Sequence, residues 1–424
     1  MPRYYIWTIG CQMNKAESMR IANYLNQFGY EPANHMKNAD IVVLNTCIVR
    51  QNAENKVIGT LGYLKGIKAS KPELNILVTG CFVDSKKDAL LSKYPYIDLF
   101  FKPGQFDALL LWGRSRNLDG CNEVIPQSEV NSISPIALLP IIQGCNNFCS
   151  YCVVPYRRGR EKSRLMEDIL EEAYCLVESG VKEIILLGQN VNSYGHDLAS
   201  KPDLSTLISK LNRIDKLARI RFLTSHPKDV NLDLIKAIAT LDKVCEHICL
   251  PLQSGDNAIL TAMRRFYSVE QYYQIINTLR YYVPDIALST DVIVGFPGET
   301  DKQFSQTVAV LQKIKFDTVH VAAYSSRPNT IASRKFDDNI PQIVKKERLE
   351  IIEQIQLEIA TETNSRFAGK EVQILVEGKK GTKWYGRTRG DKLVFFEEEG
   401  NYLGKLVKAT ITKASPWSLQ GYLS

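Results

Sequence analysis

Three apolar runs of strand length near the start of the chain each end in a cysteine, and each is followed by a segment of helical character. The runs are Tyr4–Cys11, Ile41–Cys47 and Ile76–Cys81. Strands that alternate with helices form a parallel sheet, and the loops that leave the carboxyl ends of parallel strands gather at one edge. We therefore predict a parallel-sheet α/β domain over residues 1–120, in which the thiols of Cys11, Cys47 and Cys81 lie close together.

A second group of three cysteines is compressed into one short loop. Cys145, Cys149 and Cys152 are separated by three and then two residues, in a stretch that also holds a glycine, two asparagines and a serine. Three thiolates on one loop can hold three irons of a cubic iron–sulfur cluster and leave the fourth iron open for chemistry. A structural zinc site is the alternative, but it needs four nitrogen or sulfur ligands, and no fourth ligand stands nearby in the sequence. We predict a [4Fe–4S] cluster on this loop.

The other four cysteines are interpreted as structural. Cys175 lies on the apolar side of an expected helix, and Cys121 lies in a polar connector. Cys245, His247 and Cys249 share one face of an expected strand and could bind a metal ion, but buried strands commonly carry such side chains for packing. Ten cysteines in 424 residues do not suit a disulfide framework, and the sequence shows neither a charged-then-apolar leader nor an 18-residue apolar run. We therefore expect a protein of the reducing cytoplasm.

Alternation of strand and helix resumes after a polar stretch from about Asn117 to Pro135, which we interpret as a linker. Six strand–helix units predict an open, partial (β/α)6 barrel over residues 135–364. Active sites of such barrels lie at the carboxyl edge of the sheet, and the Cys145 loop directly follows the first strand. The expected later strands are Glu183–Leu187, Arg219–Leu223, Val244–Leu250, Ile286–Val294 and Thr318–Ala323.

Polar residues and glycines collect at the ends of these strands. Gln189 and Asn190 follow the second strand, His226 follows the third, and Gln253 follows the fourth, while Asp291 lies in the fifth. Glycine lets a backbone approach a ligand closely, and amide side chains can read a nucleoside or an amino-acid group. An ordinary turn or helix cap stays open as the alternative for His226 and Asp291.

The segment that follows a long expected helix changes character. Short expected strands split by glycine-rich turns predict a small all-β barrel over residues 365–424. From residue 366 onward there are 11 basic and 6 acidic residues, within a chain of net charge +7. Phosphates attract lysine and arginine, and bases stack on aromatic rings, so we expect this barrel to bind RNA, with a solvated basic surface as the alternative. The basic residues expected to contact RNA here are Lys379, Lys380 and Arg387. The aromatic residues interleaved with them are Trp384, Tyr385 and Phe395.

A second basic run follows the cysteine loop by a few residues. Its arginines are Arg157, Arg158, Arg160 and Arg164. Because phosphates attract arginine and the run lies so near the expected cluster, we expect these arginines to bind RNA.

The succession of motifs resembles the radical S-adenosylmethionine methylthiotransferase family over essentially the whole chain, and most of all the group that acts on N6-isopentenyladenosine in tRNA. The motifs are Gly-Cys11-Gln-Met-Asn14, Asn45-Thr-Cys47, Gly80-Cys81, the Cys145 loop, Arg158-Gly-Arg160-Glu-Lys-Ser-Arg164, Leu187-Gly-Gln-Asn-Val-Asn-Ser-Tyr194, Thr224-Ser-His-Pro227, Pro251-Leu-Gln-Ser-Gly255 and Asp291-Val-Ile-Val-Gly-Phe-Pro-Gly-Glu299. Cys249 stands where the family often has His, and Asp256 where Ser is usual.

The resemblance implies a methylthiotransferase N-terminal domain, a radical-SAM barrel and an RNA-binding TRAM barrel. It also implies two [4Fe–4S] clusters and S-adenosyl-L-methionine as cofactors. The first cluster would be held by Cys145, Cys149 and Cys152, and an auxiliary cluster by Cys11, Cys47 and Cys81. The residues implied near S-adenosylmethionine are Tyr151, Val153, Gln189, Asn190 and Asp291.

The implied reaction is radical insertion of sulfur and methyl transfer at C2 of the adenine, beside the anticodon. An aromatic C–H group has no acidic proton and no leaving group, so acid–base catalysis is inadequate and cofactor-based radical chemistry is needed. The expected partners are the tRNA anticodon loop and a reducing electron-donor protein, and we expect a monomer. Threonylcarbamoyladenosine in tRNA or an aspartate of a ribosomal protein stays open as the substrate, and an RNA-binding iron–sulfur sensor stays open as a different class.

Overall fold

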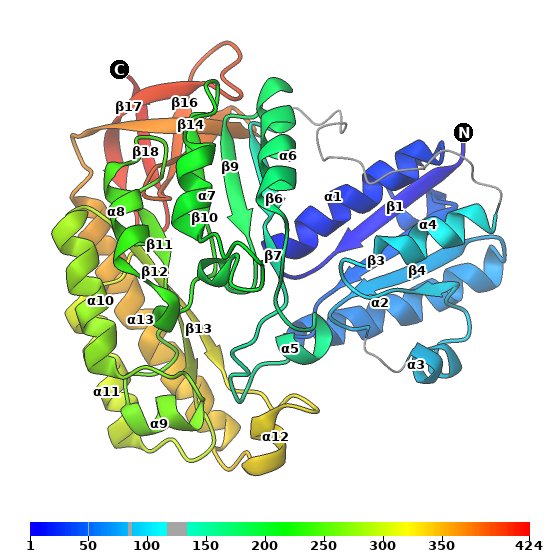
Figure 1. Cartoon of the computed structure of the whole chain (residues 1–424), viewed down its shortest axis with the longest axis horizontal. Coiled ribbons are helices and arrows are strands. Elements are labelled where there is room, and N and C mark those ends of the chain that lie inside the picture. Colours follow the sequence, from blue (N-terminus) through cyan, green and yellow to red (C-terminus); the bar gives the residue numbers. More distant parts are fainter. Residues whose placement is uncertain (50, 84–86, 117–133) are drawn as a thin grey trace. The chain divides into compact units, whose positions relative to one another are not determined.

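The computed structural model describes residues 1–49, 51–83, 87–116 and 134–424. The chain divides into two compact units, which are described separately (Figure 1). The first comprises residues 1–132, 143–146 and 152–162, and the second comprises 133–142, 147–151 and 163–424. Cys121 and all but the last two residues of the expected linker lie outside the described residues. Among the described helices, none is both long and apolar enough to cross a membrane.

A five-stranded parallel sheet in the order β2-β1-β3-β4-β5 forms the centre of the first unit, as predicted (Figure 1). Helices cover both of its faces. Val42 and Leu44 of β3 pack with α2, whereas Ile41 and Val43 pack with α1 and α4. A strand covered on both sides is apolar along its length, which explains the continuous apolar runs in the sequence. The elements are β1 (Arg3–Thr8), α1 (Gln12–Gln27), β2 (Glu31–Pro32), η1 (Met36–Asn38), β3 (Ile41–Thr46), α2 (Gln51–Ser70), β4 (Asn75–Gly80), α3 (Lys87–Lys93), β5 (Leu99–Phe100), α4 (Phe106–Arg114) and α5 (Val154–Arg157).

The second unit contains the six predicted barrel strands as two parallel sheets, β10-β9-β6 and β11-β12-β13. An isolated parallel bridge between Ile220 and Val244 connects them. The fourth strand is shorter than predicted because Val244 contributes only this bridge. The strands are β6 (Ile136–Pro140), β9 (Glu183–Leu187), β10 (Arg219–Phe222), β11 (His247–Cys249), β12 (Ala287–Val294) and β13 (Thr318–Ala323). The helices are α6 (Met166–Glu178), α7 (Leu204–Leu211), α8 (Leu232–Thr240), α9 (Asn257–Ala262), α10 (Val269–Tyr282), α11 (Asp301–Ile314), α12 (Ile331–Lys335) and α13 (Gln342–Ser365), with the single turns η3 (Val191–Ser193) and η4 (Pro227–Asp229). The short strands β7 (Ile142–Gln143) and β8 (Lys162–Ser163) precede and follow the cysteine loop in the chain.

The second unit ends in a closed five-stranded barrel in the order β14-β15-β16-β18-β17, which confirms the predicted all-β barrel. Four of its strands overlap the stretches that the sequence predicts as strands, which are Val372–Val376, Trp384–Thr388, Leu393–Phe396 and Leu406–Lys413. The fifth, β18, was not predicted because its five residues include a glycine and only three apolar side chains. Trp384 is only 6% exposed and packs in the barrel core, so it is not placed to stack on a base. The strands are β14 (Glu371–Lys380), β15 (Lys383–Thr388), β16 (Leu393–Glu397), β17 (Leu406–Ala414) and β18 (Leu419–Leu423).

Arginine side chains join this barrel to the rest of the unit through hydrogen bonds to backbone carbonyls and one partly exposed ion pair. Arg221 Nε donates to Glu183 Oε1 at 2.9 Å, and its Nη1 donates to the carbonyl of Arg389 at 3.0 Å. Arg219 Nη1 lies 3.9 Å from Glu183 and donates to the carbonyl of Arg387 at 2.7 Å. Arg389 in turn pairs with Glu246 at 2.6 Å. The small barrel is therefore held by charges rather than by apolar contacts alone.

Replacing Glu183 by glutamine is expected to lower the free energy of unfolding by about 3–5 kcal/mol, because two buried guanidinium groups lose the carboxylate that both of them contact. The midpoint of urea denaturation measures this effect. Glu178→Gln is the matched control, since Glu178 pairs with Lys216 on an exposed surface and its loss should barely move the midpoint. Equal midpoints for both variants would contradict the assignment of Glu183 as a buried counter-ion.

Candidate active site

Cys11, Cys47 and Cys81 converge at the carboxyl edge of the sheet in the first unit. Cys11 precedes α1, while the other two directly follow β3 and β4. The N–H of Cys81 donates to the carbonyl of Thr46 at 2.9 Å, which places it beside the residue before Cys47. The parallel register of β3 and β4 places Thr46 opposite Gly80. Cys47 and Cys81, which follow these two residues, are therefore close together although they are far apart in sequence.

Two glycines permit this close approach. Gly80 has φ +92°, and a Cβ there would stand 2.2 Å from the carbonyl oxygen of Thr46. Gly10 has φ +126°, and a Cβ there would stand 2.8 Å from the Cβ of Cys47. Any side chain at either position would separate the loops that carry the thiols.

The setting of these thiols suits a buried cluster. Cys47 is 8% exposed and Cys81 is 4% exposed, whereas Cys11 is more open. Burial raises the pKa of Cys81 to about 11; the guanidinium of Arg158 acts against this, and the neighbouring thiols add to it. In the described ranges no three His, Cys, Asp or Glu side chains are grouped around a position for one metal ion. An iron–sulfur cluster does not need such a group, because each of its cysteines binds a different iron. Three soft sulfur donors on separate loops, each able to bind a different iron, fit an iron–sulfur cluster.

The loop that carries the other cysteines begins in the first unit. The N–H of Cys145 donates to the carbonyl of Gly159 at 3.2 Å. Gly144 has φ +82°, and a Cβ there would stand 2.0 Å from the carbonyl oxygen of Arg160. Val153 is buried and caps α5. The backbone of Gly159 and Arg160, which follows the cysteine loop, thus holds the first residues of that loop in place.

Cys149 belongs to the second unit and has a buried arginine beside it. Arg265 is 4% exposed, and its Nη1 donates to Cys149 Sγ at 3.3 Å and to the Tyr151 hydroxyl at 3.5 Å. Its Nη2 donates to the carbonyl of Pro251 at 3.0 Å. The neighbours Arg264 and Phe266 have φ of +57° and +58°. Left-handed backbone on both sides of a buried cation is a strained arrangement of the kind found at functional sites.

The ends of the barrel strands present buried polar atoms that lack a hydrogen-bond partner among the described residues. They are Asn190 Oδ1, Ser225 Oγ, His226 Nε2 and Gln253 Oε1. Asn190 is held from its other end, since its Nδ2 donates to Asp229 at 2.7 Å. Buried polar atoms without partners call for a ligand or water. This edge therefore offers polar atoms to a ligand, and the contact of Asn190 with S-adenosylmethionine stays a prediction.

His226 is neutral in this setting. Burial, together with the charges of Arg265 and Lys228, lowers the pKa of His226 to about 2. Its Nδ1 accepts a hydrogen bond from the N–H of Lys228 at 3.3 Å, which leaves the proton on Nε2. His226 also caps the η4 turn, so the role of a helix cap, given above as the alternative for this residue, applies. Its Nε2 proton is still available to a ligand.

The remaining predicted residues lie in or near β9 and β12. Gln189 is half-buried two residues after β9, and Asp291 is half-buried within β12. The carbonyl of Asp291 accepts from the N–H of Gln253 at 2.8 Å. Burial and the charge of Asp291 raise the pKa of Cys249 to about 11. His247 shares a hydrogen bond of 3.2 Å with the Ser289 hydroxyl, and the packing role expected for His247 and its strand neighbours stays a prediction.

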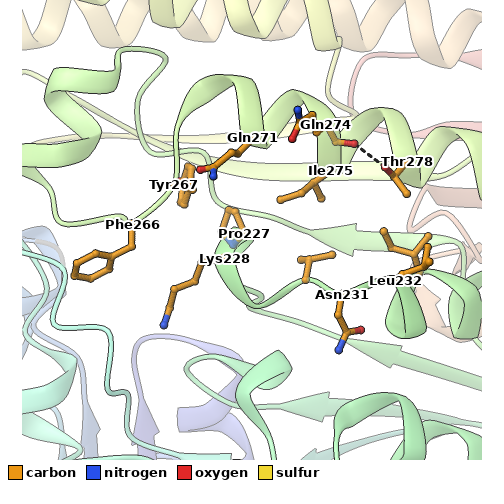
Figure 2. Close-up of a pocket in the computed structure, with 12 residues that line it drawn as sticks. Pro227, Lys228, Asn231, Leu232, Phe266, Tyr267, Gln271, Gln274, Ile275 and Thr278 are labelled. Carbon is orange, nitrogen blue, oxygen red and sulfur yellow. Dashed lines mark hydrogen bonds between the residues drawn. The ribbon is translucent and has the colours of Figure 1, made fainter.

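A cavity of about 400 Å³ lies elsewhere in the second unit, between the η4–α8 segment and α10 (Figure 2). Pro227 and Lys228 line one side, and Phe266 and Tyr267 another. The hydroxyl of Tyr267 donates to the carbonyl of Leu252 at 2.7 Å and also accepts from Arg265 Nε at 3.2 Å. Through the hydrogen bond between Tyr267 and Arg265, the cavity adjoins the side chain that contacts Cys149.

Three family models match the chain in succession. Residues 3–102 match an uncharacterized protein family, UPF0004. Residues 139–311 match the radical SAM superfamily, and residues 365–423 match the TRAM domain. The first and third segments coincide with the α/β sheet and the closed β-barrel, and the second spans the barrel from the end of β6 to α11, with β13 beyond it.

Curated relatives match over the full length. A tRNA-2-methylthio-N(6)-dimethylallyladenosine synthase of Dehalococcoides mccartyi is 48% identical, with 100% of this chain and 99% of the relative covered. A synthase of the same name from Dictyoglomus thermophilum is 44% identical over 99% of this chain and 98% of the relative. The chain belongs to this tRNA-2-methylthio-N(6)-dimethylallyladenosine synthase family. The resemblance of the sequence to radical methylthiotransferases is thereby confirmed.

Solved structures agree with the fold of this synthase family member. A radical S-adenosylmethionine methyltransferase, TsrM from Kitasatospora setae, superposes with a TM-score of 0.56 at 14% identity, covering 78% of this chain and 77% of that chain. The radical enzyme OxsB gives a TM-score of 0.57 at 12% identity, covering 86% of this chain and 67% of that chain. At such low sequence identities, the likeness shows a shared fold and no more.

The arginines predicted to bind RNA are placed differently from one another. Arg160 is exposed and Arg157 is half-buried. Arg164 pairs with Glu172 at 2.6 Å. The side chain of Arg158 is 2% exposed and pairs with Glu17, a placement that does not support the expected contact with RNA. In the β-barrel, the two predicted lysines are exposed and Arg387 pairs with acidic neighbours at 3.5 Å.

Three polar side chains near the cysteine groups of this synthase family member were not predicted as site residues from the sequence. They are Asn14 and Glu17 beside the first cysteine group and Arg265 beside Cys149. Asn14 and Glu17 lie on one side of α1, because they are three residues apart. Arg265 follows another arginine in a polar turn, and nothing in that pattern marks which of the two is buried.

Proposed function

We propose that this protein is a radical S-adenosylmethionine enzyme that methylthiolates C2 of N6-isopentenyladenosine in tRNA. The observation that carries the proposal is the meeting of Cys11, Cys47 and Cys81 at one sheet edge, in a chain that also holds the Cys145 loop. One group of three cysteines would suffice to hold the cluster that starts a radical reaction. Sulfur insertion requires a second group, and the full-length likeness to named synthases also supports methylthiolation of tRNA.

The two cysteine groups would hold two [4Fe–4S] clusters. Bound there, the clusters supply the electron for radical formation and the sulfur for transfer. The protein side chains orient and enclose the cofactors. Arg265 donates to Cys149, and the unpartnered atoms of Asn190, Ser225 and Gln253 are available to the polar groups of S-adenosylmethionine. We propose a separate reducing protein as the electron donor.

Two measurements test this function. Anaerobic, reconstituted protein with a reductant and S-adenosylmethionine should release 5′-deoxyadenosine, whereas an RNA-binding iron–sulfur sensor would release none. Mass spectrometry of tRNA nucleosides from cells that lack this chain should show loss of the 2-methylthio group and accumulation of N6-isopentenyladenosine. Loss of the methylthio group from threonylcarbamoyladenosine instead would assign the other tRNA substrate, and unchanged tRNA would point to the ribosomal protein.

We propose that the β-barrel contacts the tRNA backbone through Lys379 and Lys380. Both are exposed at the end of β14, and Lys379 Nζ lies 5.0 Å above the ring of Trp384. Replacing both lysines by alanine should weaken tRNA binding and lower the slope of log affinity against log salt by about 2, one unit for each phosphate contact.

Fluorescence titrations at several salt concentrations measure this slope. Lys346→Ala is the matched control, because Lys346 is 71% exposed and lies 3.5 Å from Glu350 on α13, outside the barrel. An unchanged slope in the double variant would assign the two lysines to a solvated surface.

A further inference from the structure

Arg158 occupies a buried position that RNA contact does not explain. Its Nη1 and Nη2 donate to the two carboxylate oxygens of Glu17 at 2.6 and 3.2 Å. The side chains are 2% and 7% exposed. Desolvating both ions opposes folding, so stability alone is a poor reason for such a pair. A role in the neighbouring cysteine site is the alternative.

Asn14 connects this pair to the cysteines. Its Oδ1 accepts from Arg158 Nη2 at 2.8 Å and from the Cys11 thiol at 3.6 Å. Its Nδ2 donates to the carbonyls of Ile9 and Thr46 at 2.8 and 2.9 Å. The carbonyl of Thr46 also receives the N–H of Cys81. One amide therefore touches the thiol of Cys11 and the backbone beside all three cysteines.

The residue after Arg158 connects to the other cysteine group. The carbonyl of Gly159 accepts from the N–H of Cys145 at 3.2 Å, within the same unit. A continuous set of contacts thus runs from the backbone of Cys145 through Arg158 and Asn14 to the thiol of Cys11. The same unit therefore fixes the start of one cysteine group relative to the other.

We propose that Arg158 is a positioning residue of the auxiliary cluster site. Its side chain binds Glu17 and Asn14, and the carbonyl of the next residue binds the start of the Cys145 loop. This inference rests on the proposed function, because it requires a cluster on Cys11, Cys47 and Cys81. The guanidinium also offsets the negative charge that three thiolates bring into a site with little access to water. Without it, the auxiliary cluster should be lost more readily than the fold.

The test uses full-length protein in which Cys145, Cys149 and Cys152 are replaced by alanine, so that only the auxiliary cluster can form. Iron and sulfide per chain are measured after anaerobic reconstitution, followed by the rate of iron release to a chelator. Arg158→Gln should release iron about 10- to 100-fold faster, as expected when a residue that orients metal ligands is lost. Arg158→Lys should restore part of the retention, since it keeps the charge without the bidentate geometry.

Lys162→Gln is the matched control, because it removes one exposed positive charge from the same segment and should leave iron release unchanged. If Arg158→Gln does not fold, the double variant Glu17→Gln/Arg158→Met removes both buried charges and should fold while still losing iron. Retention of iron equal to that of the parent in the folded double variant would overturn the proposal. A parent that takes up no iron at all would instead reject the second cluster, and with it the proposed function.

A readout on RNA separates this role from the one predicted from the sequence. The affinity of tRNA for Arg158→Gln, measured on cluster-free protein, should equal that of the parent. If Arg158→Gln loses affinity for tRNA but retains iron normally, Arg158 is an RNA-binding residue and the positioning role is overturned.

Discussion

Replacing Cys11, Cys47 and Cys81 together by alanine is expected to abolish methylthio transfer to tRNA and to leave the reductive cleavage of S-adenosylmethionine in place. The variant removes the three thiols at the sheet edge of the first unit, whereas Cys145, Cys149, Cys152 and the unpartnered polar atoms of the barrel stay unchanged. Alanine is close to cysteine in size, so the buried positions of Cys47 and Cys81 stay filled.

Liquid chromatography of the reaction mixture measures 5′-deoxyadenosine, and mass spectrometry of digested tRNA measures the methylthio product. Cys175→Ala is the matched control, since Cys175 is a half-buried cysteine of α6 and its loss should change neither product. Methylthiolated tRNA from the triple variant would reject the role of these cysteines as the sulfur-donor site.

Replacing Arg265 by methionine is expected to lower the rate of S-adenosylmethionine cleavage by about 10- to 100-fold, the usual effect of removing a group that orients a metal ligand. Its guanidinium is the donor to Cys149 Sγ, and it also fixes the carbonyl of Pro251 and the hydroxyl of Tyr267. Without the cation, the negative charge of a bound cluster is less stabilised and Cys149 loses its hydrogen bond. Arg265→Lys should recover part of the rate, because it keeps the charge.

The formation of 5′-deoxyadenosine and the fraction of cluster reduced by a fixed amount of reductant, read by electron paramagnetic resonance, measure this effect. Arg264→Met is a close control, because Arg264 has the same charge and a left-handed backbone but is exposed. A merely structural role would lower iron content without changing the reducible fraction of the clusters that remain. Parent-like cleavage by Arg265→Met would show that the contact with Cys149 carries no function.

The interpretation of basic residues was the weakest part of the sequence reasoning. A run of arginines after the cysteine loop predicts an RNA surface, because charges usually lie in solvent. The structure instead buries Arg158 against Glu17 and pairs Arg164 with Glu172. The counter-ion of Arg158 comes from α1, 141 residues earlier in the chain, and that of Arg164 comes from α6, which follows the run directly. Charge composition alone reveals neither pairing. The same limit explains why Trp384, read as a stacking platform, is a core residue of the barrel.

The sequence alone determined the two cysteine groups, the parallel sheet, the barrel strands and the small β-barrel, because strand and helix periodicity and cysteine spacing are local properties of the chain. It also predicted that three distant thiols meet, since parallel strands always direct their carboxyl ends to one edge. Only the tertiary structure decided which polar side chains face these thiols. Asn14, Glu17 and Arg265 acquire their roles from contacts across many residues, and burial, which determines whether a charge serves a site or a surface, belongs to the packed chain and not to the order of its residues.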